Sequence, residues 1–127
     1  MDLILDTNGL SAVAEGLPGA VALFAAADSV AIPVVVLGEF WFGIGRSRFR
    51  GEYDKWIREL TLSSKILEIT ESTAAVYAVV RGELKKAGTP IPSNDLWIAA
   101  LCREHRLPLL SQDGHFDRVK GLKRLGW

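Results

Sequence analysis

The chain begins with an uninterrupted apolar run, Leu3-Ile4-Leu5, that leads directly into the carboxylate of Asp6. A continuous run of this kind is typical of a strand covered on both faces, as in the middle of a parallel sheet flanked by helices. Asp6 then lies at the carboxyl end of the strand, the edge at which open α/β sheets form their ligand crevices. The N-terminus therefore predicts a central strand with a functional residue at its end.

The remaining sequence alternates short apolar strands with helical segments. After the first strand, helices are expected over 9–15, 20–27, 33–45, 52–62, 71–87 and 94–105, and short strands over 29–32, 65–69, 107–110 and 122–125. Thr70 and Ser93 are expected as helix N-caps, and Gly88 as a helix end. This alternation predicts a three-layer α/β/α sandwich with a mostly parallel central sheet.

Length and composition narrow the class of protein. The 127 residues suit one domain, and 15 basic residues balance 15 acidic ones, so no basic field indicates a nucleic-acid or membrane partner. A polyanionic substrate would have to be attracted locally or through bound cations. The single cysteine, Cys102, excludes an intrachain disulfide and fits a reducing cytosol, and one Cys with two His cannot form a zinc cluster. We expect no signal peptide and no membrane span.

Three further carboxylates lie at positions where a charged side chain needs a structural or functional reason. Glu39 follows Val34-Val35-Val36-Leu37-Gly38, so it points toward an apolar helix face, where a lone charge must be protonated, paired or bound to metal. Asp95 lies in the first turn of a predicted helix, and Asp113 follows the Leu109-Leu110 strand. Taken alone, each has an ordinary explanation: a rim Glu reaching water, an acid at a helix dipole, and a loop Asp.

The combination of the four carboxylates is more informative than any one of them. Asp6 and Asp113 follow two strands whose carboxyl ends share one sheet edge, Asp95 enters from that edge, and Glu39 lies about two turns into its helix. Carboxylates gathered in one crevice repel each other, and hard divalent cations relieve that repulsion. Ligands that are all oxygen favour Mg²⁺ or Mn²⁺, ions that activate water and neutralise phosphodiesters.

These motifs, in this order and spacing, resemble a PIN-domain ribonuclease of the VapC toxin type. The resemblance spans nearly the whole chain and is carried by Leu5-Asp6-Thr7-Asn8, Gly38-Glu39, Asn94-Asp95-Leu96-Trp97-Ile98-Ala99-Ala100, Ser111-Gln112-Asp113 and His115-Phe116-Asp117. The first motif alone is weak, whereas five in register are specific. The resemblance implies one PIN-like domain over residues 1–127.

The resemblance also implies a function. It implies a cytoplasmic Mg²⁺- or Mn²⁺-dependent endoribonuclease that cleaves RNA with a metal-activated water, is inhibited by a cognate VapB-type antitoxin and forms a homodimer. Carried over position by position, the catalytic acids are Asp6, Glu39, Asp95 and Asp113. Asp6, Asp95 and Asp113 are the expected metal ligands.

Several nearby residues receive supporting roles or are set aside. Thr7, Asn8 and Ser111 would orient carboxylates or touch phosphate, although Thr7 and Asn8 also suit a simple turn. Asp117 is either a peripheral fifth acid or a solvated loop residue. His115, between Asp113 and Asp117, could approach the scissile phosphate, but it is expected to face solvent.

Basic and aromatic residues between 40 and 57 suggest contact surfaces. Arg46, Arg48 and Arg50 either hold RNA phosphates or end a helix in solvent. Most of the aromatic side chains belong to the core, and a remainder including Trp41 and Trp56 is a candidate groove for an amphipathic antitoxin segment.

A phosphatase, a receiver domain and a non-catalytic binding domain compete with this interpretation. A phosphatase of the haloacid-dehalogenase type wants a second acid two residues after the nucleophile, where this chain has Asn8. A receiver domain wants paired early acids and a lysine after its last core strand, and residues 111–115 contain no lysine. The third alternative is a PIN-like protein- or RNA-binding domain whose carboxylates are catalytically idle.

Overall fold

The computed structural model describes the whole chain, residues 1–127. Its strands are β1 (Asp2–Leu5), β2 (Ser29–Pro33), β3 (Lys65–Leu67), β4 (Leu109–Leu110) and β5 (Arg124–Leu125). Its helices are α1 (Thr7–Ala14), α2 (Pro18–Ala26), α3 (Val34–Ile44), α4 (Arg50–Leu62), α5 (Glu71–Ala87) and α6 (Ser93–His105), with a short 3-10 helix, η1 (Gly114–Arg118).

The five strands form one parallel sheet in the order β3-β2-β1-β4-β5, with β1 in the middle. Ile4 lies opposite Ala31 of β2 and Leu109 of β4. The apolar run of β1 is fully buried, as expected for a strand covered on both faces. The predicted α/β fold is therefore confirmed, and the sheet is parallel throughout.

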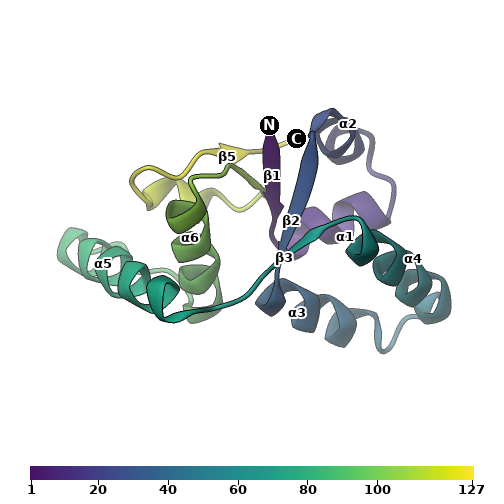
Figure 1. Ribbon diagram of the computed structural model, residues 1–127, viewed down its shortest axis with the longest axis horizontal. Coiled ribbons are helices and arrows are strands. Elements are labelled where there is room, and N and C mark those ends of the chain that lie inside the picture. The colour runs from purple at the N-terminus through teal and green to yellow at the C-terminus, as the bar shows by residue number, and fades with distance from the viewer.

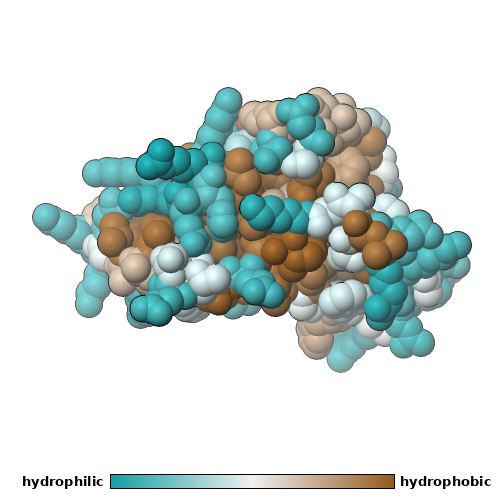
Figure 2. All heavy atoms as spheres, in the orientation of Figure 1, coloured by the Kyte–Doolittle hydropathy of each residue, from teal (hydrophilic) through white to brown (hydrophobic).

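Helices cover both faces of the sheet (Figure 1). α5 and α6 pack together on one side, and α1, α2 and α4 lie on the other, while α3 extends from the carboxyl edge. The apolar side chains between the layers form one core of 28 buried residues. Figure 2 shows hydrophilic atoms gathered over α5 and α4 at the two ends of the molecule, with apolar atoms across the middle of this face.

Local sequence signals explain both ends of α5. Thr70 caps α5 through a reciprocal pair of hydrogen bonds with Thr73, and Gly88 ends the same helix in the left-handed conformation. The expectation that Ser93 caps α6 is wrong, because Pro92 occupies the N-cap and Ser93 is already helical. Pro92 fixes an extended backbone directly before the helix, so no side-chain cap is formed there.

The strand order reverses direction next to β1. The chain builds β1, β2 and β3 outward on one side, and then returns through α5 and α6 to place β4 on the other side of β1. The crossovers that leave β1 and β4 therefore diverge, which opens a crevice at their carboxyl ends. Asp6 directly follows β1 and Ser111 directly follows β4, so both residues lie at this crevice.

No single helix is both long and apolar enough to cross a membrane. Only α1 and α2 counted together, which are bent by 104° at their junction, reach the length and apolar composition of a membrane span.

The contact between α1 and β4 requires glycine at position 9. A Cβ atom at Gly9 would overlap the carbonyl oxygen of Leu110 and approach Asp6 Oδ1 to 3.1 Å. We expect Gly9→Ala to lower the free energy of unfolding by about 1–3 kcal/mol, because the backbones must separate. Gly82→Ala, at an open and exposed position of α5, is the matched control and should raise it by up to about 1 kcal/mol. Urea unfolding measures both changes, and equal effects would contradict the close contact.

Candidate active site

Asp6 is the most deeply buried acid of the chain. It directly follows β1 and is the N-cap of α1, where its Oδ1 accepts a hydrogen bond of 2.7 Å from the Gly9 amide. Its side chain is only 3% exposed, and this burial raises the pKa of Asp6 to about 6. Hydrogen bonds from Ser111 and Gly9 lower the pKa in part, whereas the charges of Asp95 and Asp113 raise it further.

Glu39 reaches the same region from α3. The hydroxyl of Thr7, the first residue of α1, donates a 3.0 Å hydrogen bond to Glu39 Oε1. Glu39 is half-buried, so it lies at the rim of the apolar helix face. It also has a fixed hydrogen-bond partner, as expected for a carboxylate that points toward apolar side chains. The Thr7 hydroxyl therefore holds one oxygen of the Glu39 carboxylate, which agrees with the supporting role expected of Thr7.

Asp95 and Asp113 meet across a histidine. Asp95 lies in the first turn of α6, and Asp113 is the N-cap of η1. His115 Nε2 lies 2.7 Å from Asp95 Oδ2, and His115 Nδ1 lies 2.9 Å from Asp113 Oδ1. Burial raises the pKa of Asp95 above its usual range, and the neighbouring His115 opposes that rise.

The expectation that His115 faces solvent is wrong. Its side chain is 18% exposed and lies between two carboxylates. Its sequence position, two residues after Asp113 in a short turn, was compatible with contact to that acid. Contact with Asp95 depends on the packing of α6 against the segment after β4, which no local sequence signal predicts.

All four predicted acids line one open hollow of 570 Å³, which we call the acidic hollow. Its lining comprises Asp6, Thr7, Asn8, Ser11, Ala12, Glu15, Leu17, Glu39, Asp95, Gln112, Asp113 and Trp127. The structure thus brings together residues separated by more than 100 positions in the chain. His115 contacts two of the acids from behind this lining.

The loop after β4 is fixed by polar contacts to its neighbours. Asn8 Oδ1 accepts a 3.1 Å hydrogen bond from the Gln112 amide, and Ser111 Oγ accepts one of 3.0 Å from the Asp113 amide. Gln112 also exchanges two hydrogen bonds with the backbone of Trp127, which forms part of the wall. Sequence reasoning missed this role of Trp127, which depends on the pairing of β5 with β4.

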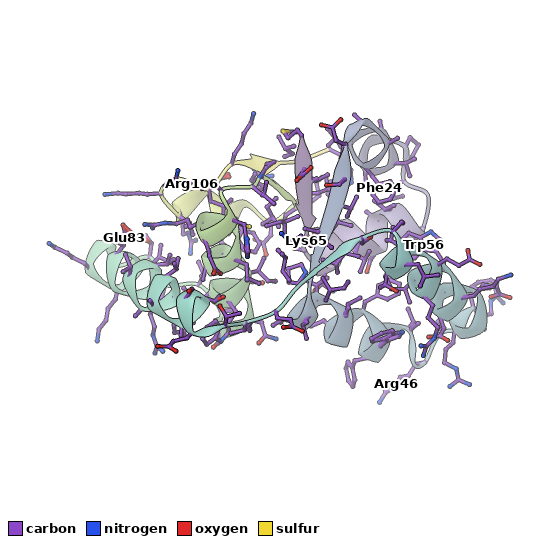
Figure 3. The ribbon with its side chains drawn as sticks, viewed as in Figure 1. Phe24, Arg46, Trp56, Lys65, Glu83 and Arg106 are labelled. Carbon is purple, nitrogen blue, oxygen red and sulfur yellow. The ribbon has the colours of Figure 1, made fainter.

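Other candidate residues lie outside the acidic hollow. Asp117 is exposed and forms an ion pair with Arg124 through two bonds of 2.9 Å, so it is no fifth acid of the hollow. Arg46 points away from the body at the end of α3 (Figure 3). Neither Arg48 nor Arg50 lines the hollow.

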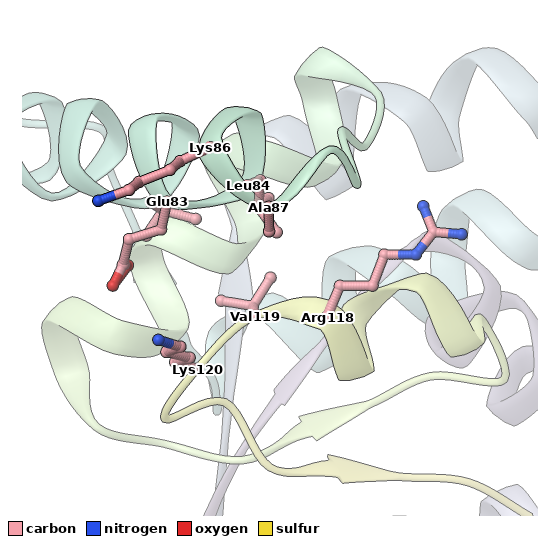
Figure 4. A pocket seen from close by; sticks show the side chains of 8 residues that line it. Glu83, Leu84, Lys86, Ala87, Arg118, Val119 and Lys120 are labelled. Carbon is pink, nitrogen blue, oxygen red and sulfur yellow. The ribbon is translucent and has the colours of Figure 1, made fainter.

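A second hollow, of 400 Å³, lies between α5 and the segment that follows η1 (Figure 4). Its charged lining residues are Glu83, Lys86, Arg118 and Lys120. One acid among three cations offers no set of ligands for a divalent cation.

The donor set of the acidic hollow suits a hard divalent cation. Carboxylate oxygens of Asp6, Asp95 and Asp113 border one space, and the rise in the pKa of Asp6 shows that its charge is poorly compensated. Ligand atoms of Asp95, Asp113 and His115 also lie within 4.8 Å of one another. Both observations fit a metal ion, which would offset the negative charge.

The family model of the PIN domain matches residues 3–122, and the chain belongs to that family. It is 31% identical to ribonuclease VapC5 of Mycobacterium tuberculosis over 125 residues, which cover 93% of this chain and 87% of that protein. It is 28% identical to ribonuclease VapC2 of Haemophilus influenzae over 102 residues, or 80% and 77% of the two chains. The family match favours the nuclease interpretation over the phosphatase and receiver alternatives.

Solved structures share the fold along the full length. VapBC2 from Rickettsia felis, bound to a promoter DNA fragment, aligns with a TM-score of 0.85 and 24% identity over 100% of this chain and 99% of that chain. VapBC-5 from M. tuberculosis aligns with a TM-score of 0.78 and 25% identity over 99% and 98%.

The raised pKa of Asp6 gives the metal-free protein a defined pH dependence. The unfolded chain loses this proton near pH 4 and the folded chain near pH 6, so the folded state holds more protons between these values. The stabilising contribution is complete below about pH 4 and is lost as the pH rises through about 6, a change of about 3 kcal/mol.

Asp6→Asn removes this contribution without removing the hydrogen bond from Gly9. We expect the free energy of unfolding of the wild type minus that of Asp6→Asn, measured with urea in EDTA, to fall across this pH interval. A difference that stays constant, or rises with pH, would contradict the assignment of Asp6 as the buried, unfavourably charged group.

Proposed function

We propose that this protein is a divalent-metal-dependent endoribonuclease and the toxin of a toxin–antitoxin pair. The observation that carries the proposal is the convergence of Asp6, Glu39, Asp95 and Asp113 on one hollow at the reversal of strand order. Membership of the PIN family and similarity to proteins named ribonuclease VapC support the same activity.

Asp6, Asp95 and Asp113 are the proposed metal ligands. Their donors are all oxygen, which favours Mg²⁺ or Mn²⁺. The bound ion supplies positive charge that neutralises the phosphodiester and lowers the pKa of a water. Ser111 donates to Asp6 and Asn8 holds the loop that carries Asp113, so these residues fix the spacing of the ligands.

Glu39 is the proposed acceptor of the proton from the attacking water. Thr7 engages its Oε1, which leaves Oε2 for a water in the hollow. This arrangement aims the carboxylate without neutralising it. The water proton passes to Glu39 Oε2 as the water oxygen bonds to phosphorus. The bond from phosphorus to the leaving ribose oxygen breaks with its electron pair on that oxygen, which solvent then protonates.

The proposed partners are an RNA substrate, a second copy of the chain and a VapB-type antitoxin, all in the cytoplasm. The solved neighbours include VapBC structures. On this chain, Trp41 of α3 is 37% exposed and Phe42 is 86% exposed, and both suit an apolar antitoxin segment. Trp56 instead packs against Phe40 with ring centroids 6.0 Å apart, so it supports the core beneath that surface.

RNA cleavage provides the direct test. Purified wild type should cleave RNA with Mg²⁺ or Mn²⁺, and EDTA should abolish cleavage. Asp6→Asn and Asp95→Asn should each reduce the rate by at least about 10²-fold while remaining folded, because each removes a charged ligand. Asp28→Asn is the matched control, since Asp28 is exposed and precedes β2 at the opposite edge of the sheet.

Two outcomes would contradict the nuclease. Undiminished cleavage by Asp6→Asn would remove the acidic hollow from the reaction. A wild-type protein that binds Mn²⁺ weakly or not at all by calorimetry, and cleaves no RNA, would instead identify an idle binding domain.

The antitoxin surface can be tested by co-purification with the product of the neighbouring reading frame. Phe42→Ala should weaken that complex by about 10-fold or more, because it removes the most exposed large apolar side chain of α3. Leu62→Ala is the control, since Leu62 is 89% exposed but lies at the end of α4. Equal retention of the antitoxin by both variants would place the interface elsewhere.

A further inference from the structure

We propose that the imidazole of His115 competes with a divalent cation for Asp95 and Asp113, so that the cation binds these carboxylates at the expense of their contacts with the ring. The inference rests on the proposed function, because it concerns the same acidic hollow. It assigns His115 as a positioning residue that sets the strength of metal binding.

The imidazole bridges the two carboxylates. Nε2 lies 2.7 Å from Asp95 Oδ2 and Nδ1 lies 2.9 Å from Asp113 Oδ1. The two nitrogens of an imidazole point in divergent directions, so each of them faces a different carboxylate. The ring therefore lies between the two acids and engages one oxygen of each.

The contact to Asp95 is close but poorly directed. Nε2 is buried and has no partner of acceptable hydrogen-bond geometry, although Asp95 Oδ2 is 2.7 Å away. The angle at Nε2 departs from that of an aligned hydrogen bond, although the same imidazole lowers the pKa of Asp95. Such a contact can be exchanged for a cation, which attracts the same oxygen more strongly.

The surroundings let the ring move without unfolding η1. The backbone amide of His115 donates a 3.2 Å hydrogen bond to Asp113 Oδ1, which fixes the start of the turn. Phe116, the next residue, is completely buried and anchors the turn in the core. Rotation about the side-chain bonds of His115 can therefore free both carboxylates while the backbone stays in place.

Displacement has an energetic consequence. Carboxylates that are already engaged by a side chain bind a cation less tightly than the same acids would without it. In the absence of a cation, the same ring gives both carboxylates a polar neighbour at short distance. Removing the ring should therefore tighten metal binding and destabilise the metal-free protein.

The test compares His115→Ala with the wild type, using the full chain, MnCl₂ and no RNA. We expect calorimetry to show at least about threefold tighter Mn²⁺ binding by the variant. In EDTA its melting temperature should be lower than that of the wild type, and added Mn²⁺ should raise it by more. His105→Ala is the matched control, because His105 ends α6 beside Glu104 and outside the hollow, and it should leave the Mn²⁺ affinity unchanged.

A second variant provides the same test if His115→Ala does not fold. His115→Gln retains a side chain that reaches one carboxylate but cannot bridge both, and its Mn²⁺ affinity should lie between those of the wild type and the alanine variant. Circular dichroism verifies the fold of each protein.

Other results would overturn the inference in distinguishable ways. Weaker Mn²⁺ binding by His115→Ala would make His115 a metal ligand, and unchanged binding would make it a bystander; both leave the proposed nuclease intact. Absence of Mn²⁺ binding by the wild type and the variant alike would overturn the metal dependence itself, and this inference with it.

Discussion

The parallel pairing of β1 with β4 is the constraint on which the site depends. Backbone hydrogen bonds join Ile4 N to Pro108 O at 2.9 Å and Asp6 N to Leu110 O at 3.4 Å, so the two strands end side by side. Because strand order reverses here, no crossover covers these ends. The acidic hollow is therefore a product of topology, and α6 and α3 only add side chains to it.

Unfavourable electrostatics accompany this arrangement. Asp6 is buried beside other acids, and its hydrogen bonds from Gly9 and Ser111 offset only part of the desolvation. Burial of this charge therefore opposes folding at neutral pH, where sites of this kind trade stability for activity. A divalent cation would supply the positive charge that this hollow lacks, and the imidazole of His115 contacts two of its acids.

Helix α3 connects two surfaces with different chemistry. Glu39 turns inward to Thr7, while Phe42, three residues later, is almost fully exposed. A partner that covers the exposed aromatic side chains of α3 would lie within one helical turn of a proposed catalytic acid. Inhibitor binding and substrate access can thus be linked through a single rigid element, without a conformational change elsewhere.

The sequence by itself determined the fold class and the approximate positions of the helices, and it predicted the four acids that line one hollow. The apolar run before Asp6, the Thr70 cap and the left-handed Gly88 are local signals, and local backbone preferences decide such features. The tertiary structure alone decided that His115 lies between Asp95 and Asp113, that Asp117 pairs with Arg124, and that Trp127 forms a wall of the hollow. These contacts join segments that only sheet pairing and helix packing bring together, and such long-range proximity leaves no periodicity in the chain.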